Sequence, residues 1–161
     1  MRISNAPKNY KCPICLAING FETAETMILQ QDIFYQDGLI LGIINSKFVE
    51  NNPGHIILVP RQHFENIYDL PDEVGAHIFK MSKVFAIALK SIRECDGITI
   101  RQNNEPASNQ HAFHYHLHIF PRFENDGFEK LSECTKILKP EERKKYSTDL
   151  RNWLKDFNNS K

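Results

Sequence analysis

The stretch NQHAFHYHLHIFPR, residues 109–122, holds four of the seven histidines in the chain. Three of these histidines occupy every second position, and apolar side chains fill the positions between them. The histidines are His114, His116 and His118, and the apolar residues are Tyr115, Leu117 and Ile119. Because successive side chains of a β-strand point to opposite faces, this alternation predicts a strand over residues 114–121 with its apolar face on the core. The imidazoles then share the other face, with neighbours about 6–7 Å apart.

Three interpretations of this imidazole row stay open. Two histidines two positions apart on a strand can share one Zn²⁺ ion. Alternatively, one imidazole acts in nucleophilic or acid–base catalysis while its neighbours orient it, or the row is a polar face without chemistry. The segment RQNNEPASNQ, residues 101–110, favours catalysis on a phosphate, because neutral amides donate well to phosphate oxygens and are poor zinc ligands. Two more histidines, His55 and His63, flank an apolar stretch upstream.

Alternation and turn residues predict the other strands. Strands are expected over 25–31, 33–45, 55–60 and 97–102, and the polar stretch 48–54 is expected to be a loop. Gln36, Asp37 and Gly38 are typical of a hairpin turn.

Two helices are predicted from apolar residues spaced three and four apart, over 71–95 and 140–157. Gly97 is the expected C-cap of the first helix, and His77 is expected to face solvent on it. In the second helix, Trp153 is expected to anchor the tail by packing. Since strands come in runs and helices come singly, the fold class is α+β with a mostly antiparallel sheet.

The length of 161 residues predicts one domain, 1–161, with a loose arm over 1–11 and a core over about 12–122. Twenty basic and twenty acidic residues cancel, which gives no long-range attraction for nucleic acid or an anionic membrane. No apolar run approaches the roughly 20 residues of a membrane helix, and no signal peptide is expected, so a cytoplasmic location is predicted. In such a compartment the close pair Cys12 and Cys15 is expected to bind a metal or to be redox-active, whereas Cys95 and Cys134 are expected to be ordinary thiols.

The combined motifs resemble the histidine triad (HIT) family of nucleotide hydrolases and transferases. The family pattern His-x-His-x-His is present as residues 114–118, and the family's Gln and Asn positions are occupied by Gln110 and Asn103. The segment NNPGHIILVPRQH, residues 51–63, resembles the family's Pro-Gly-His strand, and many bacterial members share the CPIC start. The similarity covers about residues 12–122.

This resemblance implies a five-stranded antiparallel sheet with one long helix, a homodimer, and a purine nucleotide as substrate. The implied activity is attack by His116 on the α-phosphate of a nucleoside phosphoramidate or a dinucleoside polyphosphate, through a nucleotidyl-histidine intermediate. The carbonyl of His114 would fix the tautomer of His116, and His118 and His55 would offset the phosphate charge. Gln110 and Asn103 would donate hydrogen bonds to phosphate oxygens, each worth roughly 3 kcal/mol if it strengthens in the transition state.

Three positions bear on substrate recognition. Lys47 stands where many family members have an acidic residue for the ribose hydroxyls, and a short insertion would bring Asn45 there instead. His111 stands where Ser or Thr is common, and it either donates to the phosphate or is simply exposed. An apolar slot for the base is expected from residues 35–45.

The resemblance also implies a structural zinc ion, because some bacterial members combine the cysteine pair with two histidines. Those four ligands are Cys12, Cys15, His63 and His114. The alternative is a buried cysteine pair beside a surface His63. A redox role fits the pair less well, because redox pairs of this spacing open a helix after a strand and no strand precedes this pair. The phosphate chemistry itself requires no metal.

Three other functions remain open at this stage. A nucleotidyltransferase would use the same intermediate and pass the nucleotidyl group to a metabolite. A non-catalytic nucleotide-binding protein would bind purine mononucleotides without turnover. A zinc enzyme would use the triad itself as metal ligands.

Overall fold

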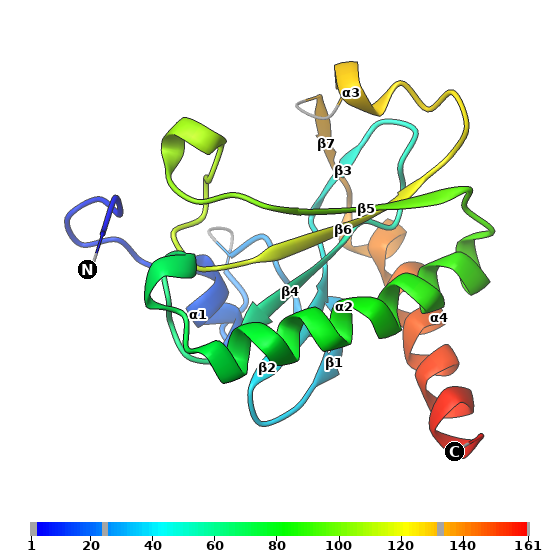
Figure 1. The fold of residues 1–161 in the computed structure, drawn as a ribbon, viewed down its shortest axis with the longest axis horizontal. Coiled ribbons are helices and arrows are strands. Elements are labelled where there is room, and N and C mark those ends of the chain that lie inside the picture. Colours follow the sequence, from blue (N-terminus) through cyan, green and yellow to red (C-terminus); the bar gives the residue numbers. More distant parts are fainter. Residues whose placement is uncertain (1–2, 24–25, 132–133, 161) are drawn as a thin grey trace.

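A computed structural model describes residues 3–23, 26–131 and 134–160. Its centre is a five-stranded antiparallel sheet in the order β1-β2-β4-β6-β5, which confirms the predicted α+β class (Figure 1). The strands of this sheet are β1 (Ile33–Gln36), β2 (Ile40–Ile44), β4 (Ile56–Pro60), β5 (Gly97–Gln102) and β6 (Leu117–Arg122). No helix in these three described ranges is long and apolar enough to cross a membrane.

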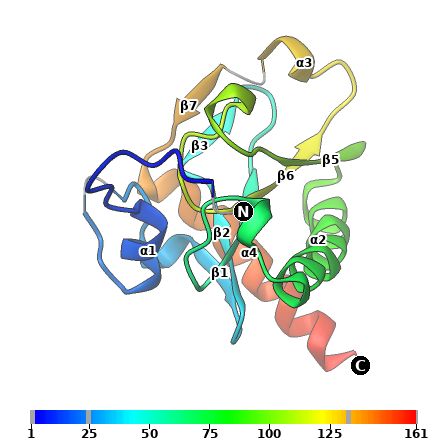
Figure 2. The same cartoon turned by 60° about the vertical axis from the view of Figure 1, so that its left-hand side comes forward.

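Helices cover the sheet on both faces. The helices are α1 (Pro13–Ile18), α2 (Asp72–Arg93), α3 (Phe128–Leu131) and α4 (Pro140–Asn159), with short 3₁₀ turns at Gln30–Asp32, Ile67–Asp69 and Pro106–Ser108. Figure 2 shows α1 and α2 on opposite sides of the sheet. Along β4, Ile56 and Leu58 pack in the core with α2, whereas Ile57 and Val59 pack in a second core with α1. Burial on both faces explains why this strand is a continuous apolar run.

The long helix α2 follows its predicted periodicity, because Val74, Ile78, Phe85 and Leu89 are all buried against the sheet. Its predicted end is wrong. The helix closes at Glu94, which takes the left-handed conformation with φ of 51°, while Gly97 opens β5. In α4, Leu150 is buried and Trp153 packs against the same core, as predicted.

The hairpin between β1 and β2 turns at Asp37, as predicted. One carboxylate oxygen accepts hydrogen bonds from the backbone amides of Leu39 (2.8 Å) and Ile40 (2.9 Å). The other accepts from the Tyr35 hydroxyl at 2.6 Å and lies 2.7 Å from Nε2 of His77. His77 therefore does not simply face solvent, because it ties α2 to the hairpin.

Asp37 gives the fold a testable pH dependence. Burial raises the pKa of its carboxyl, but hydrogen bonds from Tyr35, His77 and the turn amides outweigh burial and lower the pKa to about 2. A depressed folded-state pKa stabilises the protein above the unfolded-state value of about 3.9, and this contribution is lost as the pH falls towards 2. We expect Asp37→Asn to reduce the free energy of unfolding by about 1 kcal/mol at pH 6 and by much less near pH 2. Urea titrations of both proteins test this, and a difference that does not change with pH would contradict it.

Several segments differ from prediction. In the expected strand 25–31, Glu25 lies outside the described residues, and the part from Thr26 onward is a turn, a coil and a 3₁₀ turn. The cause is Asp32, whose buried carboxylate accepts from the Leu29 amide at 2.8 Å and pairs with Arg143 at 3.2 Å. A second, two-stranded sheet of β3 (Lys47–Val49) and β7 (Thr135–Ile137) also replaces part of the predicted loop 48–54.

The described part of the predicted loose arm is held by hydrogen bonds. The Ile3 carbonyl accepts from the Asn66 side chain at 2.8 Å, and the Ser4 hydroxyl donates to Glu65 at 2.6 Å. These contacts place Ile3 and Ser4 beside Glu65 and Asn66, in the segment that follows β4.

Candidate active site and metal centre

The histidine row begins before its strand. β6 starts at Leu117, so His114 and His116 lie in the segment just before the strand and only His118 of the three lies within it. The Tyr115 amide donates to the Phe64 carbonyl at 2.6 Å, which ties this segment to the loop after β4. The three apolar residues of the alternation, Tyr115, Leu117 and Ile119, are buried in the core with α2, as predicted.

The two ring nitrogens of His116 differ in their hydrogen bonding. Its Nδ1 lies 2.7 Å from the carbonyl oxygen of His114, and only a protonated nitrogen can donate to that oxygen. Burial lowers the pKa of His116, so the ring is neutral at neutral pH and its Nε2 carries a lone pair. His116 also lines a cavity, where that nitrogen can act as a nucleophile.

His118 and His55 form a coupled pair. Nε2 of His55 lies 2.8 Å from Nδ1 of His118, so one nitrogen donates, the other accepts, and both rings cannot be protonated together. Burial is the largest cause that lowers the pKa of His55, and the nearby charges of Arg101 and His116 lower it further, to about 3. Burial also holds the pKa of His118 well below its ordinary value. In the free protein these imidazoles are neutral, so the fixed positive charge that faces a phosphate must come from other side chains.

The cavity in front of these histidines has a volume of about 270 Å³. Asn45, Asn103 and His111 line it together with His55, His116 and His118, so the structure brings most of the predicted site residues together. Its wall in the described part of the chain includes no aspartate or glutamate, and its two fixed cations there are Lys47 and Arg101. Such a cavity suits an anion.

Gln110 is placed differently from expectation. Its side chain is 2% exposed, and its Nε2 donates to the carbonyls of Glu65 (2.6 Å) and Ala112 (3.2 Å). Its Oε1 accepts from the Glu105 amide at 2.6 Å. Because both ends of the amide bind backbone, Gln110 braces the loop rather than lining the cavity, where Asn109 is found instead.

The residues expected to contact the substrate phosphate and ribose lie in the wall of the cavity. Asn103 lines it with its Nδ2 3.4 Å from the Asn109 carbonyl, a weak contact that leaves this amide able to turn towards a ligand. His111 is exposed on the wall, which is compatible with both roles expected for it. Asn45 and Lys47 both line the cavity, and Nδ2 of Asn45 donates to the Lys47 carbonyl at 3.0 Å.

The apolar part of the cavity lies elsewhere than predicted. Of the segment 35–45, only Asn45 reaches the cavity wall. One group of apolar lining residues comes from α1, from the segment before η1 (Gln30–Asp32) and from β4, namely Pro13, Ile14, Met27, Ile28 and Ile57. Val49, Ala112 and Phe120 complete the apolar lining.

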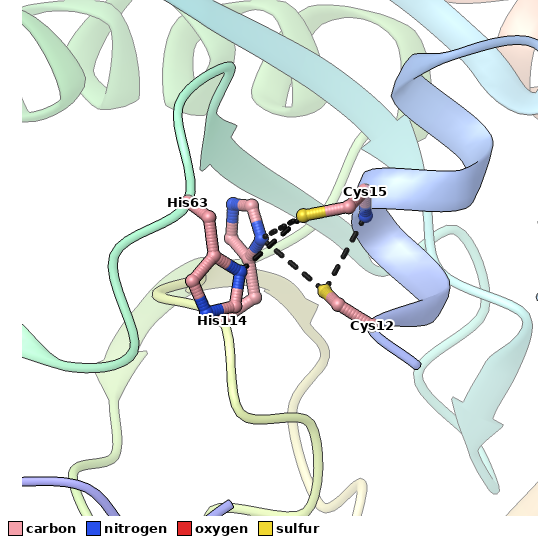
Figure 3. A group of neighbouring side chains, drawn as sticks. All are labelled: Cys12, Cys15, His63 and His114. Carbon is pink, nitrogen blue, oxygen red and sulfur yellow. Dashed lines mark hydrogen bonds between the residues drawn. The ribbon is translucent and has the colours of Figure 1, made fainter. Parts of the chain in front are cut away.

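A second cluster joins α1 to the histidine segment, as Figure 3 shows. Nδ1 of His114 lies 3.4 Å from the Cys12 sulfur and 3.5 Å from the Cys15 sulfur, and Nδ1 of His63 lies 3.3 Å from the Cys15 sulfur. The four candidate ligand atoms all lie within 4.8 Å of one another. All four predicted metal ligands are therefore brought together.

The chemistry of this cluster fits a zinc ion. Tetrahedral zinc with Zn–S of about 2.3 Å and Zn–N of about 2.0 Å separates sulfur and nitrogen ligands by about 3.5 Å, close to the distances of 3.3–3.5 Å found here. Nε2 of His114 lies 2.9 Å from the Pro60 carbonyl, which fixes the proton there and leaves Nδ1 free to ligate. A hydrogen bond between the two cysteine side chains lowers the pKa of Cys12 and raises that of Cys15, so Cys12 ionises more readily than Cys15.

The structure reveals Arg101 as a cavity residue that sequence reasoning missed. Arg101 lies on β5 directly opposite His118 on β6, and its guanidinium carbon is 5.3 Å from the centre of the Phe120 ring. Strand alternation in GITIRQ could have placed Arg101 on one face of β5, but only the pairing register shows that it meets His118.

Comparison with known proteins supports the resemblance seen in the motifs. The family model described as HIT domain matches residues 28–125. An uncharacterized HIT-like protein of Borreliella burgdorferi is 32% identical over 124 residues, which cover 74% of this chain and 81% of that protein. The adenylylsulfatase HINT3 of Arabidopsis thaliana is 26% identical over 125 residues, 78% of this chain and 59% of that protein.

A solved structure shares the fold and bears on the metal. The zinc-bound histidine triad family protein of Mycobacterium smegmatis superposes with a TM-score of 0.74 at 27% identity, covering 94% of this chain and 98% of that one. The motif, the family match over residues 28–125 and this shared fold agree, so the chain belongs to the histidine triad (HIT) family.

Proposed function

We propose that this protein is a nucleotide hydrolase that attacks the α-phosphate of nucleoside phosphoramidates or dinucleoside polyphosphates. The HIT family includes nucleotide hydrolases and nucleotide-binding proteins. The observation that carries the proposal is the placement of His116, whose Nδ1 proton is committed to the His114 carbonyl while the ring lines a cavity that also holds Lys47 and Arg101.

The reaction would proceed by two displacements at phosphorus. In the first, Nε2 of His116 forms a bond to the α-phosphorus, and the bond to the leaving group breaks with its electron pair; an amine leaving group takes up one proton as it departs. In the second, the oxygen of water bonds to phosphorus and releases one proton, and the bond from phosphorus to Nε2 breaks with its electron pair, which restores the neutral imidazole. His118 and His55 would hydrogen-bond the phosphate, and the positive charge that develops on His116 is balanced by the bound anion.

The remaining residues would bind the nucleotide. The purine base would occupy the apolar part of the cavity beside Ile57, and Asn45 or Lys47 would contact the ribose. Asn103 and His111 would donate to phosphate oxygens. We propose that Gln110 acts indirectly, because it holds the loop that presents these donors.

We propose that Cys12, Cys15, His63 and His114 hold a structural zinc ion. A bound zinc would stabilise the fold by fixing α1 against the histidine segment. His114 serves both sites, because its ring reaches the cluster while its carbonyl fixes His116. We propose a cytoplasmic location, because the cysteine thiols must stay reduced to bind a metal ion. We also propose that the chain forms a single HIT domain.

We also propose a homodimer. β5 is an edge strand of the sheet, and Ile100 on it is 42% exposed. An open strand edge with an apolar side chain is a surface on which a second copy can pair. Sedimentation equilibrium should show a dimer that Ile100→Lys dissociates, and a wild-type monomer at tens of micromolar would contradict this.

A substrate panel tests the proposed activity. Adenosine 5′-phosphoramidate, diadenosine triphosphate and diadenosine tetraphosphate are each incubated with the wild type, and the products are separated with and without added alcohol or phosphate acceptors. Release of AMP in water supports a hydrolase, whereas transfer to an acceptor identifies a transferase. Micromolar binding of AMP without turnover of any substrate would contradict the proposal and indicate a binding protein.

A further inference from the structure

One row of paired residues crosses the floor of the cavity. In the strand register, Ile43 on β2 pairs with Ile57 on β4, Ile57 pairs with His118 on β6, and His118 pairs with Arg101 on β5. Residues directly opposite each other on neighbouring strands point to the same face of a sheet. Ile57, His118 and Arg101 all line the cavity, so the row is its floor.

Polarity changes steadily along this row. Ile43 and Ile57 belong to the apolar core with α1, His118 is an imidazole, and Arg101 ends the row with a permanent positive charge. At about 4.8 Å per strand, the backbone positions of Ile57 and Arg101, two strands apart, are separated by about 10 Å, with His118 between them. The ring of Phe120 lies under the guanidinium and stacks on His55 with ring centres 3.8 Å apart, which fixes Arg101 beside the catalytic histidines.

The positions of the charges point to a second anionic group on the substrate. A nucleotide whose base occupies the apolar end and whose α-phosphate lies over the histidines must extend its leaving group towards the other end. Arg101 lines the cavity wall at this end, and Lys47 is the other cation of the described wall. A guanidinium binds phosphate or sulfate oxygens through paired hydrogen bonds, and it gains nothing comparable from a neutral amine.

We propose that Arg101 binds the leaving group and selects substrates in which an anhydride oxygen joins the α-phosphate to a second phosphate or a sulfate. This inference rests on the proposed nucleotide hydrolysis. As the bond from His116 Nε2 to phosphorus forms, the bond from phosphorus to the bridging oxygen breaks. The bridging oxygen keeps the electron pair and leaves as part of an anion, which Arg101 stabilises without a proton. An amine leaving group instead requires a proton and makes no use of the guanidinium.

Steady-state kinetics on two substrates test the assignment. Adenosine 5′-phosphosulfate has an anionic leaving group, and adenosine 5′-phosphoramidate has a neutral one. We expect Arg101→Gln to lower kcat/KM for the phosphosulfate by about 30-fold and for the phosphoramidate by less than about threefold, with partial recovery in Arg101→Lys. Arg61→Gln removes an exposed arginine outside the cavity and should leave both values unchanged.

Equal losses on both substrates, or no loss on the phosphosulfate, would overturn the assignment. A binding measurement separates this outcome from failure of the proposed function, because it needs no turnover. In calorimetric titrations the wild type should bind ADP more tightly than AMP, and Arg101→Gln should lose most of that preference. If Arg101→Gln keeps the wild-type ratio, Arg101 does not contact the second anionic group, whatever the catalytic result.

Discussion

Replacing His116 with alanine is expected to lower kcat for nucleotide hydrolysis by on the order of 10⁴-fold or more, because the variant lacks the atom that bonds to phosphorus. No other described imidazole combines a free nitrogen in the cavity with a proton fixed on a backbone carbonyl, since His55 and His118 bind each other. The fold should persist, because within the described residues the His116 ring hydrogen-bonds to one backbone carbonyl, that of His114, and loss of that bond amounts to about 1 kcal/mol.

Single-turnover kinetics and thermal unfolding of the same preparations test this expectation. His77→Ala is the matched control, because it also removes a partly buried imidazole and a hydrogen bond, but it lies outside the cavity at the β1–β2 hairpin. The control His77→Ala should unfold at a somewhat lower temperature than the wild type and keep its activity. Residual activity of His116→Ala within tenfold of the wild type would exclude His116 as the nucleophile.

Removal of the cysteine pair is expected to have the largest effect on stability. In Cys12→Ser/Cys15→Ser, bound zinc should fall from about one per chain to near zero, and the free energy of unfolding should fall by several kcal/mol. The physical reason is that α1 contributes Ile14 and Ala17 to the second core, and the cluster is its link to His63 and His114. Metal analysis by mass spectrometry and urea titration measure the two effects.

Cys134→Ser is the matched control, because this thiol is exposed and lies outside the cluster. It should change neither the zinc content nor the stability. A cysteine-pair variant that keeps its zinc, or a wild type that binds none when supplied with it, would contradict the proposed metal centre. Because no step at phosphorus is assigned to the metal, chelated protein that stays folded should keep its activity, and its loss from folded protein would favour a zinc enzyme.

Local sequence patterns predicted the parts of the molecule that depend on local geometry. The spacing of Val74, Ile78 and Phe85 defines one face of α2, and that face is buried as expected. The hydrogen bond from His116 to the carbonyl two residues earlier is equally local, so motif resemblance could place it. The spacing of Cys12 and Cys15 predicted a metal-binding or redox pair, and the resemblance to the family added His63 and His114 as the other ligands of the cluster.

Features set by distant contacts could not be predicted in the same way. A glutamine can donate a hydrogen bond to a phosphate, but the side-chain amide of Gln110 is hydrogen-bonded to the backbone of Glu65 and Glu105. Only the folded loop brings these backbone groups near Gln110. Arg101 meets His118 through strand register, which a single sequence does not specify. The segment after Thr26 has strand-like composition, but the buried pair of Asp32 and Arg143 imposes a 3₁₀ turn instead.

The stereochemical course at phosphorus tests the central claim most directly. A substrate made chiral at the α-phosphorus with oxygen isotopes or sulfur is hydrolysed in labelled water, and the configuration of the nucleotide product is determined. Two successive displacements through a nucleotidyl-imidazole predict retention of configuration. Inversion would mean that water attacks phosphorus in a single step, and it would contradict the assignment of residue 116 as the nucleophile.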